Sequence, residues 1–154
     1  VDLATLLLDL PIDPDSLELI ETESRRIEER RADLVARVRG RDDGDEFILH
    51  IEIQNNNHPK MAWRMLRYLV DIALQHPHLP VRQFLIYIGR DSLTMPAGIE
   101  LDHLRYDYAQ VDMRSLDCAS LLARDDPDAL VLAILCDFGG RDPQAVVNHI
   151  LSRL

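Results

Sequence analysis

Two stretches of the chain alternate between apolar and polar side chains, which is the period of a half-buried β-strand. They span residues 31–39 and 47–54, and the turn-rich run 40–45 between them contains two glycines. This arrangement predicts an antiparallel hairpin. With the turn centred between residues 42 and 43, the numbers of paired residues sum to 85. A slip by two residues would keep every side chain on the same face.

A helical pattern follows the hairpin. Pro59 suits the first position of a helix, which is expected to end before Pro77. Residues 81–88 then have the composition of a buried strand. A strand, a helix and a strand over this length predict a right-handed crossover that leaves the two strands parallel. The apolar residues of the helix recur at helical spacing: Ala62, Met65, Leu66, Leu69, Val70 and Ala73.

Three other segments give weaker patterns. Residues 17–23 fit either a first strand or a helical turn. Residues 90–104 have the composition of a loop, and residues 105–113 that of a further, more exposed strand. The strands and the helix together predict an α/β fold.

The last third of the chain is expected to be helical. Ser115 can cap a short helix, and the Asp-Pro pairs at 126–127 and 142–143 can each start another, because Asp caps well and Pro fits the first helical position. The glycine pair at 139–140 is expected to end the middle helix. The fold class is therefore α/β with a helical C-terminal extension.

Composition limits the range of partners. The 154 residues suit one domain, and the longest apolar stretch, 129–136, is far shorter than the ~20 residues of a membrane-spanning helix. No leader is visible and the two cysteines lack metal-type spacing, so we expect a cytoplasmic protein that has no membrane partner. The chain starts at Val1 and stops at Leu154 within a helix-like pattern, from which we expect a longer parent protein.

The net charge of −10 is unfavourable for nucleic-acid binding, but it is unevenly distributed. Residues 25–90 carry twelve basic and nine acidic side chains, so a polyanion would be met there. Lys60, Arg64 and Arg67 form a basic stripe on the predicted helix, which is either a solvated face or a set of phosphate contacts. Arg31 is a further candidate for contacting DNA. Two aromatic residues of this helix are candidates for base stacking or for packing: Trp63 and Tyr68.

The predicted register places Asp33 opposite Glu52, on the face that also holds His50. Carboxylates in that position repel each other unless a cation lies between them, and Mg²⁺ or Mn²⁺ would satisfy such a pair. The alternative is a solvated hairpin face whose acidic side chains are balanced by Arg31 and Arg37. Spacing alone does not decide between the two interpretations.

A family resemblance adds to this pattern. The runs RADLV (31–35), ILHIEIQ (48–54) and MAWRMLRY (61–68) together resemble the recombination-promoting nuclease and transposase-like family of bacteria, within the PD-(D/E)XK nuclease superfamily. The resemblance covers roughly residues 17–115. It implies a restriction-endonuclease-like core over 1–114, in which a mixed sheet is flanked by helices, and the helical extension over 115–154 would pack on that core.

The resemblance also implies a site. Asp33 and Glu52 stand for the two motif acids, Gln54 replaces the usual Lys, and the backbone carbonyl of Ile53 completes a site for Mg²⁺ or Mn²⁺. Asp9 is a candidate for the helix acid of the superfamily, which could also precede the chain. The implied activity is hydrolysis of DNA phosphodiesters with little sequence preference, linked to recombination or mobile elements. Gln54 can orient a metal-bound water but cannot act as a base.

A second hypothesis comes from a different class of protein. The charge of −10 and Gln54 favour a weak or inactive relative that binds a protein partner or a second copy of itself as a homodimer. Divalent-metal binding that disappears in Asp33→Ala would favour the nuclease. Self-association that is insensitive to salt, without DNA binding, would favour the interaction module.

Overall fold

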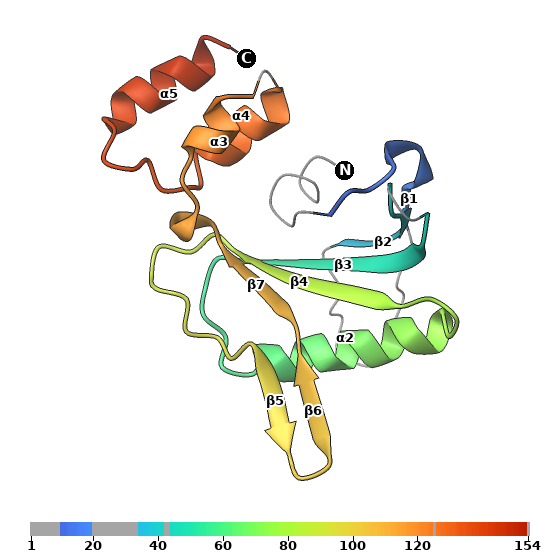
Figure 1. Cartoon of the computed structure of the whole chain (residues 1–154). Coiled ribbons are helices and arrows are strands. Elements are labelled where there is room, and N and C mark those ends of the chain that lie inside the picture. Colours follow the sequence, from blue (N-terminus) through green and yellow to red (C-terminus); the bar gives the residue numbers. More distant parts are fainter. Residues whose placement is uncertain (1–9, 20–33, 42–43, 125, 154) are drawn as a thin grey trace.

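The computed structural model describes residues 10–19, 34–41, 44–124 and 126–153. A five-stranded mixed sheet lies between one long helix on one face and the C-terminal helices on the other (Figure 1). The strands are ordered β1 (Glu18–Leu19), β2 (Leu34–Arg39), β3 (Glu46–Gln54), β4 (Val81–Tyr87) and β7 (Ala109–Asp112). The helices are α2 (Met61–Gln75), α3 (Ala119–Leu122), α4 (Pro127–Ala133) and α5 (Pro143–Leu151). Two short 3₁₀ turns are η1 (Pro14–Ser16) and η2 (Met113–Ser115).

The predicted hairpin is confirmed with its register. β2 pairs antiparallel with β3 from Leu34 opposite Ile51 to Arg39 opposite Glu46, so the numbers of each pair sum to 85. β1, at the edge of the sheet, pairs antiparallel with β2 over Glu18 and Leu19. The first strand expected over 17–23 is therefore present at these two residues, and residues 20–23 lie outside the described part of the chain.

The predicted crossover is also confirmed in its strand direction. β4 pairs parallel with β3, with Glu52 opposite Leu85, and α2 connects them. β7 then pairs parallel with the far side of β4. β3 is thus the strand at which the sheet changes from antiparallel to parallel. The helix begins at Met61 rather than at Pro59, which lies in the preceding turn, and it ends before Pro77 as expected.

Each face of the sheet has its own apolar core. The α2 core contains Val35, Ile48, Met61, Ala62, Met65, Tyr68, Ile72, Leu85, Tyr87, Met95, Tyr106 and Tyr108. The C-terminal core joins the other face of the sheet to the C-terminal helices, and its members from the two sides include Phe47, Leu49, Ile51, Leu121, Leu130 and Ile150. β3 contributes to both cores, so the six consecutive residues 47–52 are all buried.

The segment between β4 and η2 differs from the expectation. The expected loop over 90–104 contains β5 (Gly98–Leu101), which pairs antiparallel with β6 (Leu104–Asp107) in a hairpin that projects from the body (Figure 1). The single strand expected over 105–113 is divided at Tyr108, whose backbone N–H donates to Ala97. The division arises because β6 pairs with β5, whereas β7 pairs with β4.

The helical C-terminal extension is present, with some boundaries corrected. Asp126 and Asp142 cap α4 and α5 through their side chains, as predicted. Ser115 is not a helix cap, because it is the last residue of η2. The glycines at 139–140 lie beyond the end of α4 at Ala133, in a connection where both have positive φ. Within the described part of the chain, no helix has the length and apolar character needed to span a membrane.

Candidate functional site

Glu52 is a charged residue in the interior of the sheet. It lies on β3, the middle strand, and its side chain is 0% exposed. Alternation along β3 directs it to the same face as Ile48 and His50, which is the face covered by α2. The solvated-face alternative is therefore wrong for Glu52. An ionised carboxylate in such a place is strongly destabilising unless it is paired.

The partner of Glu52 is Arg64, which reaches down from α2. Its Nη2 donates to Oε1 of the carboxylate, and the Arg64 side chain is 20% exposed. The guanidinium is held from a second side, because its Nε donates to the hydroxyl of Tyr68 at 3.2 Å. Arg37, which the sequence offered as a balancing charge, instead forms a salt bridge with Glu46 near the hairpin turn. Among the described residues, the positive charge beside Glu52 therefore comes from Arg64 on the helix.

Gln54 takes part in the same cluster. Its side-chain Nε2 donates to Oε1 of Glu52 at 3.1 Å, so the carboxylate oxygen that meets Arg64 also accepts from the amide. The side chain of Ile53 points to the opposite face and is 41% exposed. Glu52 and Gln54, both predicted as site residues, are therefore brought together by the structure.

His50 lies on the other side of Glu52 and is 0% exposed. Its Nε2 is 3.8 Å from Oε2 of Glu52, and its ring meets the ring of Tyr68 edge-on, with 5.1 Å between centroids. Its Nδ1 is 2.8 Å from Nε2 of Gln83 on β4. Gln83 also donates to the carbonyl of Met65 and accepts from the hydroxyl of Tyr106. A buried polar chain therefore runs from the β5–β6 hairpin to the carboxylate.

The hydroxyl of Tyr106 donates the hydrogen bond to Gln83 at one end of this buried row of polar side chains. Burial is the main cause that raises the pKa of Tyr106 well above its usual range, so the hydroxyl keeps its proton at any ordinary pH. The pKa of the neighbouring Tyr108 is raised for the same reason, and its hydroxyl donates to the carbonyl of Pro96. Both tyrosines thus act as neutral structural donors at the base of the hairpin.

The other predicted site residues have different positions. Asp33, Arg31 and Asp9 lie outside the described residues. Lys60 and Arg67 are exposed on or beside α2 as the basic stripe requires, whereas Arg64 is turned inward to Glu52. The sequence interpretation missed Gln83 and Tyr106. A signal for Gln83 was present, because it and its neighbour Arg82 interrupt the otherwise apolar run 81–88.

The donor chemistry around Glu52 suits a hard divalent cation. A carboxylate, a nearby backbone carbonyl at Ile53 and a side-chain amide are oxygen ligands of the kind that Mg²⁺ and Mn²⁺ prefer. Among the described residues, no group of three or more His, Cys, Asp or Glu side chains could hold a metal. The described part supplies one of the two predicted carboxylates, Glu52, and the other, Asp33, lies outside the described residues.

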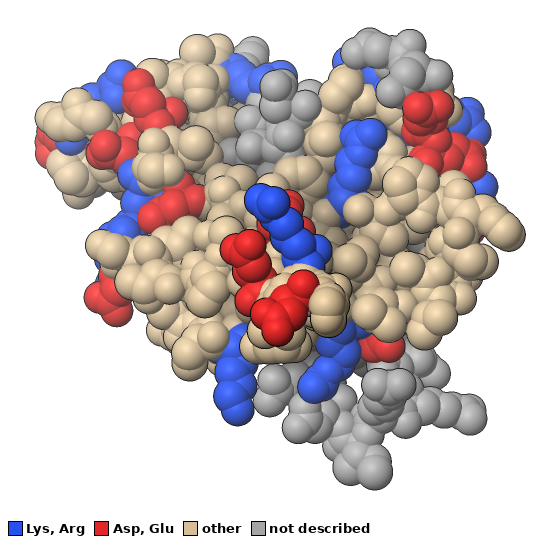
Figure 2. Space-filling model, turned by 60° about the horizontal axis from the view of Figure 1, so that its bottom comes forward, with Lys and Arg blue, Asp and Glu red and all other residues tan. Residues whose placement is uncertain are grey.

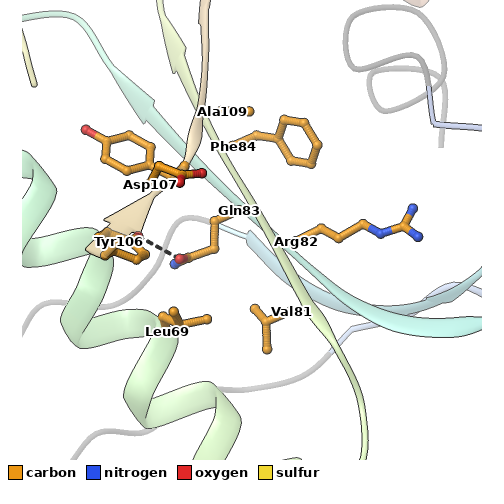
Figure 3. A pocket seen from close by; sticks show the side chains of 9 residues that line it. Leu69, Val81, Arg82, Gln83, Phe84, Tyr106, Asp107 and Ala109 are labelled. Atoms are coloured by element: carbon orange, nitrogen blue, oxygen red, sulfur yellow. Dashed lines mark hydrogen bonds between the residues drawn. The ribbon is translucent and has the colours of Figure 1, made fainter. Parts of the chain in front are cut away.

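A pocket of about 280 Å³ opens beside the polar chain, lined by Leu69, Val81, Arg82, Gln83, Phe84, Tyr106, Asp107, Tyr108 and Ala109. Figure 3 shows Gln83 reaching toward Tyr106, while Arg82 extends away from it. Glu52 does not line this pocket. The pocket is connected to the cluster around Glu52 through Gln83, which forms part of the pocket wall and contacts His50.

The charges on the surface are mixed. On the face in Figure 2, basic and acidic side chains lie close together, and no broad area is of one sign. This face therefore offers no broad basic surface to a polyanion.

Comparison of the chain with protein-family models, with curated proteins and with solved structures finds no match. The α/β class, with its five-stranded mixed sheet flanked by helices, comes from the structure alone. The nuclease resemblance stays a prediction from the sequence.

Proposed function

We propose that this protein is a metal-dependent DNA endonuclease of the PD-(D/E)XK kind, with its site built around Glu52. The observation that carries the proposal is the complete burial of this carboxylate on the middle strand, between His50 and Gln54. Burying a charged group costs several kcal/mol in real proteins, and perturbed or buried charges concentrate at functional sites. A hairpin whose polar face was solvated would not contain a completely buried carboxylate.

The proposed cation site combines Glu52 with the carbonyl of Ile53 and with Asp33. Extending the observed β2–β3 register by one pair would set Asp33 opposite Glu52. When bound, a divalent ion would polarise a phosphate and lower the pKa of a water. The chain's own contribution is to hold the Glu52 carboxylate fixed, through Gln54 and Arg64. The amide of Gln54 would orient the attacking water but would not remove its proton.

DNA would be held through its phosphates. Arg64, 20% exposed, lies between Glu52 and the surface of α2, where a guanidinium can receive a phosphate without leaving the site. Lys60 and Arg67 on the same helix would add backbone contacts, with Arg31 as a fourth candidate. Contacts of this type carry no sequence information, in agreement with an endonuclease of little sequence preference. Recombination or mobile-element upkeep is the proposed context.

The test is cleavage of supercoiled plasmid by purified protein in Mg²⁺ or Mn²⁺. We expect nicking that is abolished by EDTA, by Asp33→Ala and by Glu52→Gln, because each removes the cation or a carboxylate that holds it. His103→Gln, in the turn between β5 and β6, is the matched control and should cleave like the wild type. Folded wild-type protein that leaves the plasmid intact in both metals would contradict the proposal.

The second candidate is an inactive nuclease-like fold that binds a protein partner or a second copy of the chain. The observation that favours it is the Glu52–Arg64 ion pair, which neutralises the carboxylate without any metal. Val131 on α4 and Ile134, the residue that follows the helix, are also exposed. Calorimetry with Mn²⁺ separates the two functions, since the interaction module predicts no binding heat that depends on Glu52.

A further inference from the structure

We infer that Gln83 fixes His50 as the neutral tautomer that carries its proton on Nε2, which makes His50 a donor to Glu52 and not a metal ligand. His50 is then a positioning residue for the carboxylate. The assignment of the tautomer depends only on the hydrogen bonds of the described residues. Its consequence for metal choice rests on the proposed function.

The first step fixes the orientation of the Gln83 amide. Its Nε2 is 3.0 Å from the carbonyl oxygen of Met65, and its Oε1 is 2.7 Å from the hydroxyl of Tyr106. A backbone carbonyl only accepts, so the group facing Met65 must be the NH₂. The opposite orientation would bring two oxygens together in a buried site where Gln83 is 8% exposed. The amide therefore has one permitted orientation.

The second step transfers this constraint to His50. One hydrogen of the Gln83 NH₂ is used by Met65, and the other faces Nδ1 of His50 at 2.8 Å. Nδ1 must present a lone pair to accept it, because a protonated Nδ1 would oppose a second N–H. The single proton of the neutral ring is consequently on Nε2.

The third step concerns the direction of that proton. Nε2 of His50 is completely buried, and none of the described groups lies within hydrogen-bond distance of it. The nearby acceptor is Oε2 of Glu52 at 3.8 Å, and a shift of about 1 Å would bring it to hydrogen-bond length. A buried donor without a partner is destabilising. A small movement of Glu52 would therefore be favoured if it let Nε2 of His50 donate to Oε2 of Glu52.

Glu52 would then be held from both sides, by Gln54 and Arg64 on Oε1 and by His50 on Oε2. Because His50 has no lone pair to offer on Nε2, the cation site receives oxygen ligands alone. Such a set selects hard ions such as Mg²⁺ and Mn²⁺ over Zn²⁺, which imidazole suits. Gln83 and Tyr106, which do not touch Glu52, thereby take part in determining which metal the site accepts.

The direct test is NMR of the wild-type protein with ¹⁵N-labelled histidine at neutral pH. Two-bond correlations from the ring carbon-bound hydrogens distinguish the two neutral tautomers and the charged ring. His50 is assigned by the signal that disappears in His50→Gln. We expect a protonated Nε2 and an unprotonated Nδ1. A proton on Nδ1, or on both nitrogens, would overturn the inference.

A pair of variants tests the positioning role. The amide nitrogen of His50→Gln can take the place of Nε2, whereas that of His50→Asn lies near Nδ1 and cannot reach Glu52. We expect His50→Asn to lower Mn²⁺ affinity roughly tenfold, as loss of an outer partner does, and His50→Gln to retain most of it. Calorimetry measures both, and His103→Gln is the control. Equal losses in the two His50 variants would overturn the positioning role.

These measurements also separate the inference from the proposed function. If the wild type binds no Mn²⁺ and leaves plasmid intact, the nuclease proposal fails. The NMR experiment still decides the tautomer in that case, because it needs no metal and no DNA. Zn²⁺ that binds wild-type protein more tightly than Mn²⁺, and does so through His50, would contradict the inference even in an active nuclease.

Discussion

Arg64 is the residue on which the buried charge of Glu52 depends most directly. The guanidinium is attached to α2 and the carboxylate to β3, so their contact fixes the helix against the sheet as well as neutralising a charge. Pairs of this kind contribute little net stability compared with apolar packing. Removal of one partner, however, leaves the other buried and uncompensated. The asymmetry allows the structural and functional roles of the pair to be separated.

We predict that Arg64→Ala lowers the free energy of unfolding by about 3 kcal/mol, because it removes the guanidinium that donates to the buried carboxylate of Glu52. Lys60→Ala, an exposed residue next to the same helix, should change it by less than about 0.5 kcal/mol. Urea unfolding followed by circular dichroism measures both. If Arg64→Ala is as stable as Lys60→Ala, Glu52 does not need the guanidinium.

The stability of Arg64→Ala should respond differently to added metal depending on whether the protein is a nuclease or an interaction module. In a nuclease, Mg²⁺ or Mn²⁺ can supply the missing positive charge, so either ion should stabilise Arg64→Ala more than it stabilises the wild type. In an interaction module, neither ion should restore stability. The double variant Arg64→Ala with Glu52→Gln is the control, because it has no buried charge for the ion to balance.

At the scale of elements, the β2–β3 hairpin carries a salt-bridge cluster close to its turn. Arg37 and Arg39 both contact Glu46, and their hydrogen bonds, Arg37 first, hold the pKa of Glu46 below its ordinary value of 4.5. The folded carboxyl is thus ionised at a pH where the unfolded one binds a proton. Its stabilising contribution is complete above pH 4.5 and is lost as the pH falls through the lower, folded pKa.

We therefore predict that the urea midpoint of the wild type decreases between about pH 6 and about pH 3 more than that of Glu46→Gln. The amide of the variant still accepts from the two arginines but does not titrate. The difference should be small, since all three side chains are well exposed. Parallel pH profiles of the two proteins would show that the cluster does not contribute to stability.

Local patterns were sufficient to predict the hairpin and the crossover. The hairpin strands alternate over six or more residues, and the crossover combines a helical apolar stripe with the mostly apolar run 81–88. It was not sufficient for β5 and β6, each of four residues, whose pairing is decided by tertiary contacts. The face of α2 was predicted less well than its existence. The predicted apolar stripe included Val70 and left out Tyr68 and Ile72, whereas the structure exposes Val70 and buries the other two.

That difference explains what the sequence could and could not predict about the site. Turning α2 toward Tyr68 also turns Arg64 toward the sheet, so a residue predicted for the solvent side meets Glu52. Strand alternation was enough to place Glu52 and Gln54 on one face. Contacts between elements distant in sequence, such as Gln83 with His50, have no local signal.

At the scale of the whole molecule, the reactivity of the two cysteines measures how often the C-terminal helices separate from the sheet. Cys118 and Cys136 are free thiols within the C-terminal core. Burial is the main cause that raises the pKa of Cys136 to about 11. At pH 8 only about one Cys136 thiol in a thousand would be ionised, and the thiolate is the reactive form.

We predict that both thiols react slowly with Ellman's reagent in the folded protein and rapidly in urea. Leu130→Ala, which removes apolar contacts from the same core, should accelerate the reaction because it favours opening of the helices. Val131→Ala, an exposed neighbour on α4, is the matched control. Fast reaction of the folded wild type would mean that the helices separate readily from the sheet.

The burial of β3 on both faces has a consequence for how this protein can vary over evolutionary time. An ordinary surface strand accepts polar replacements at every second position, so half of its sites can drift freely. Residues 47–52 of β3 have no outward side, since one set faces α2 and the other faces the C-terminal helices. This strand should therefore diverge more slowly than its neighbours even at positions that have no part in chemistry. The Glu52 region would then remain recognisable among distant relatives whether or not they retain an activity.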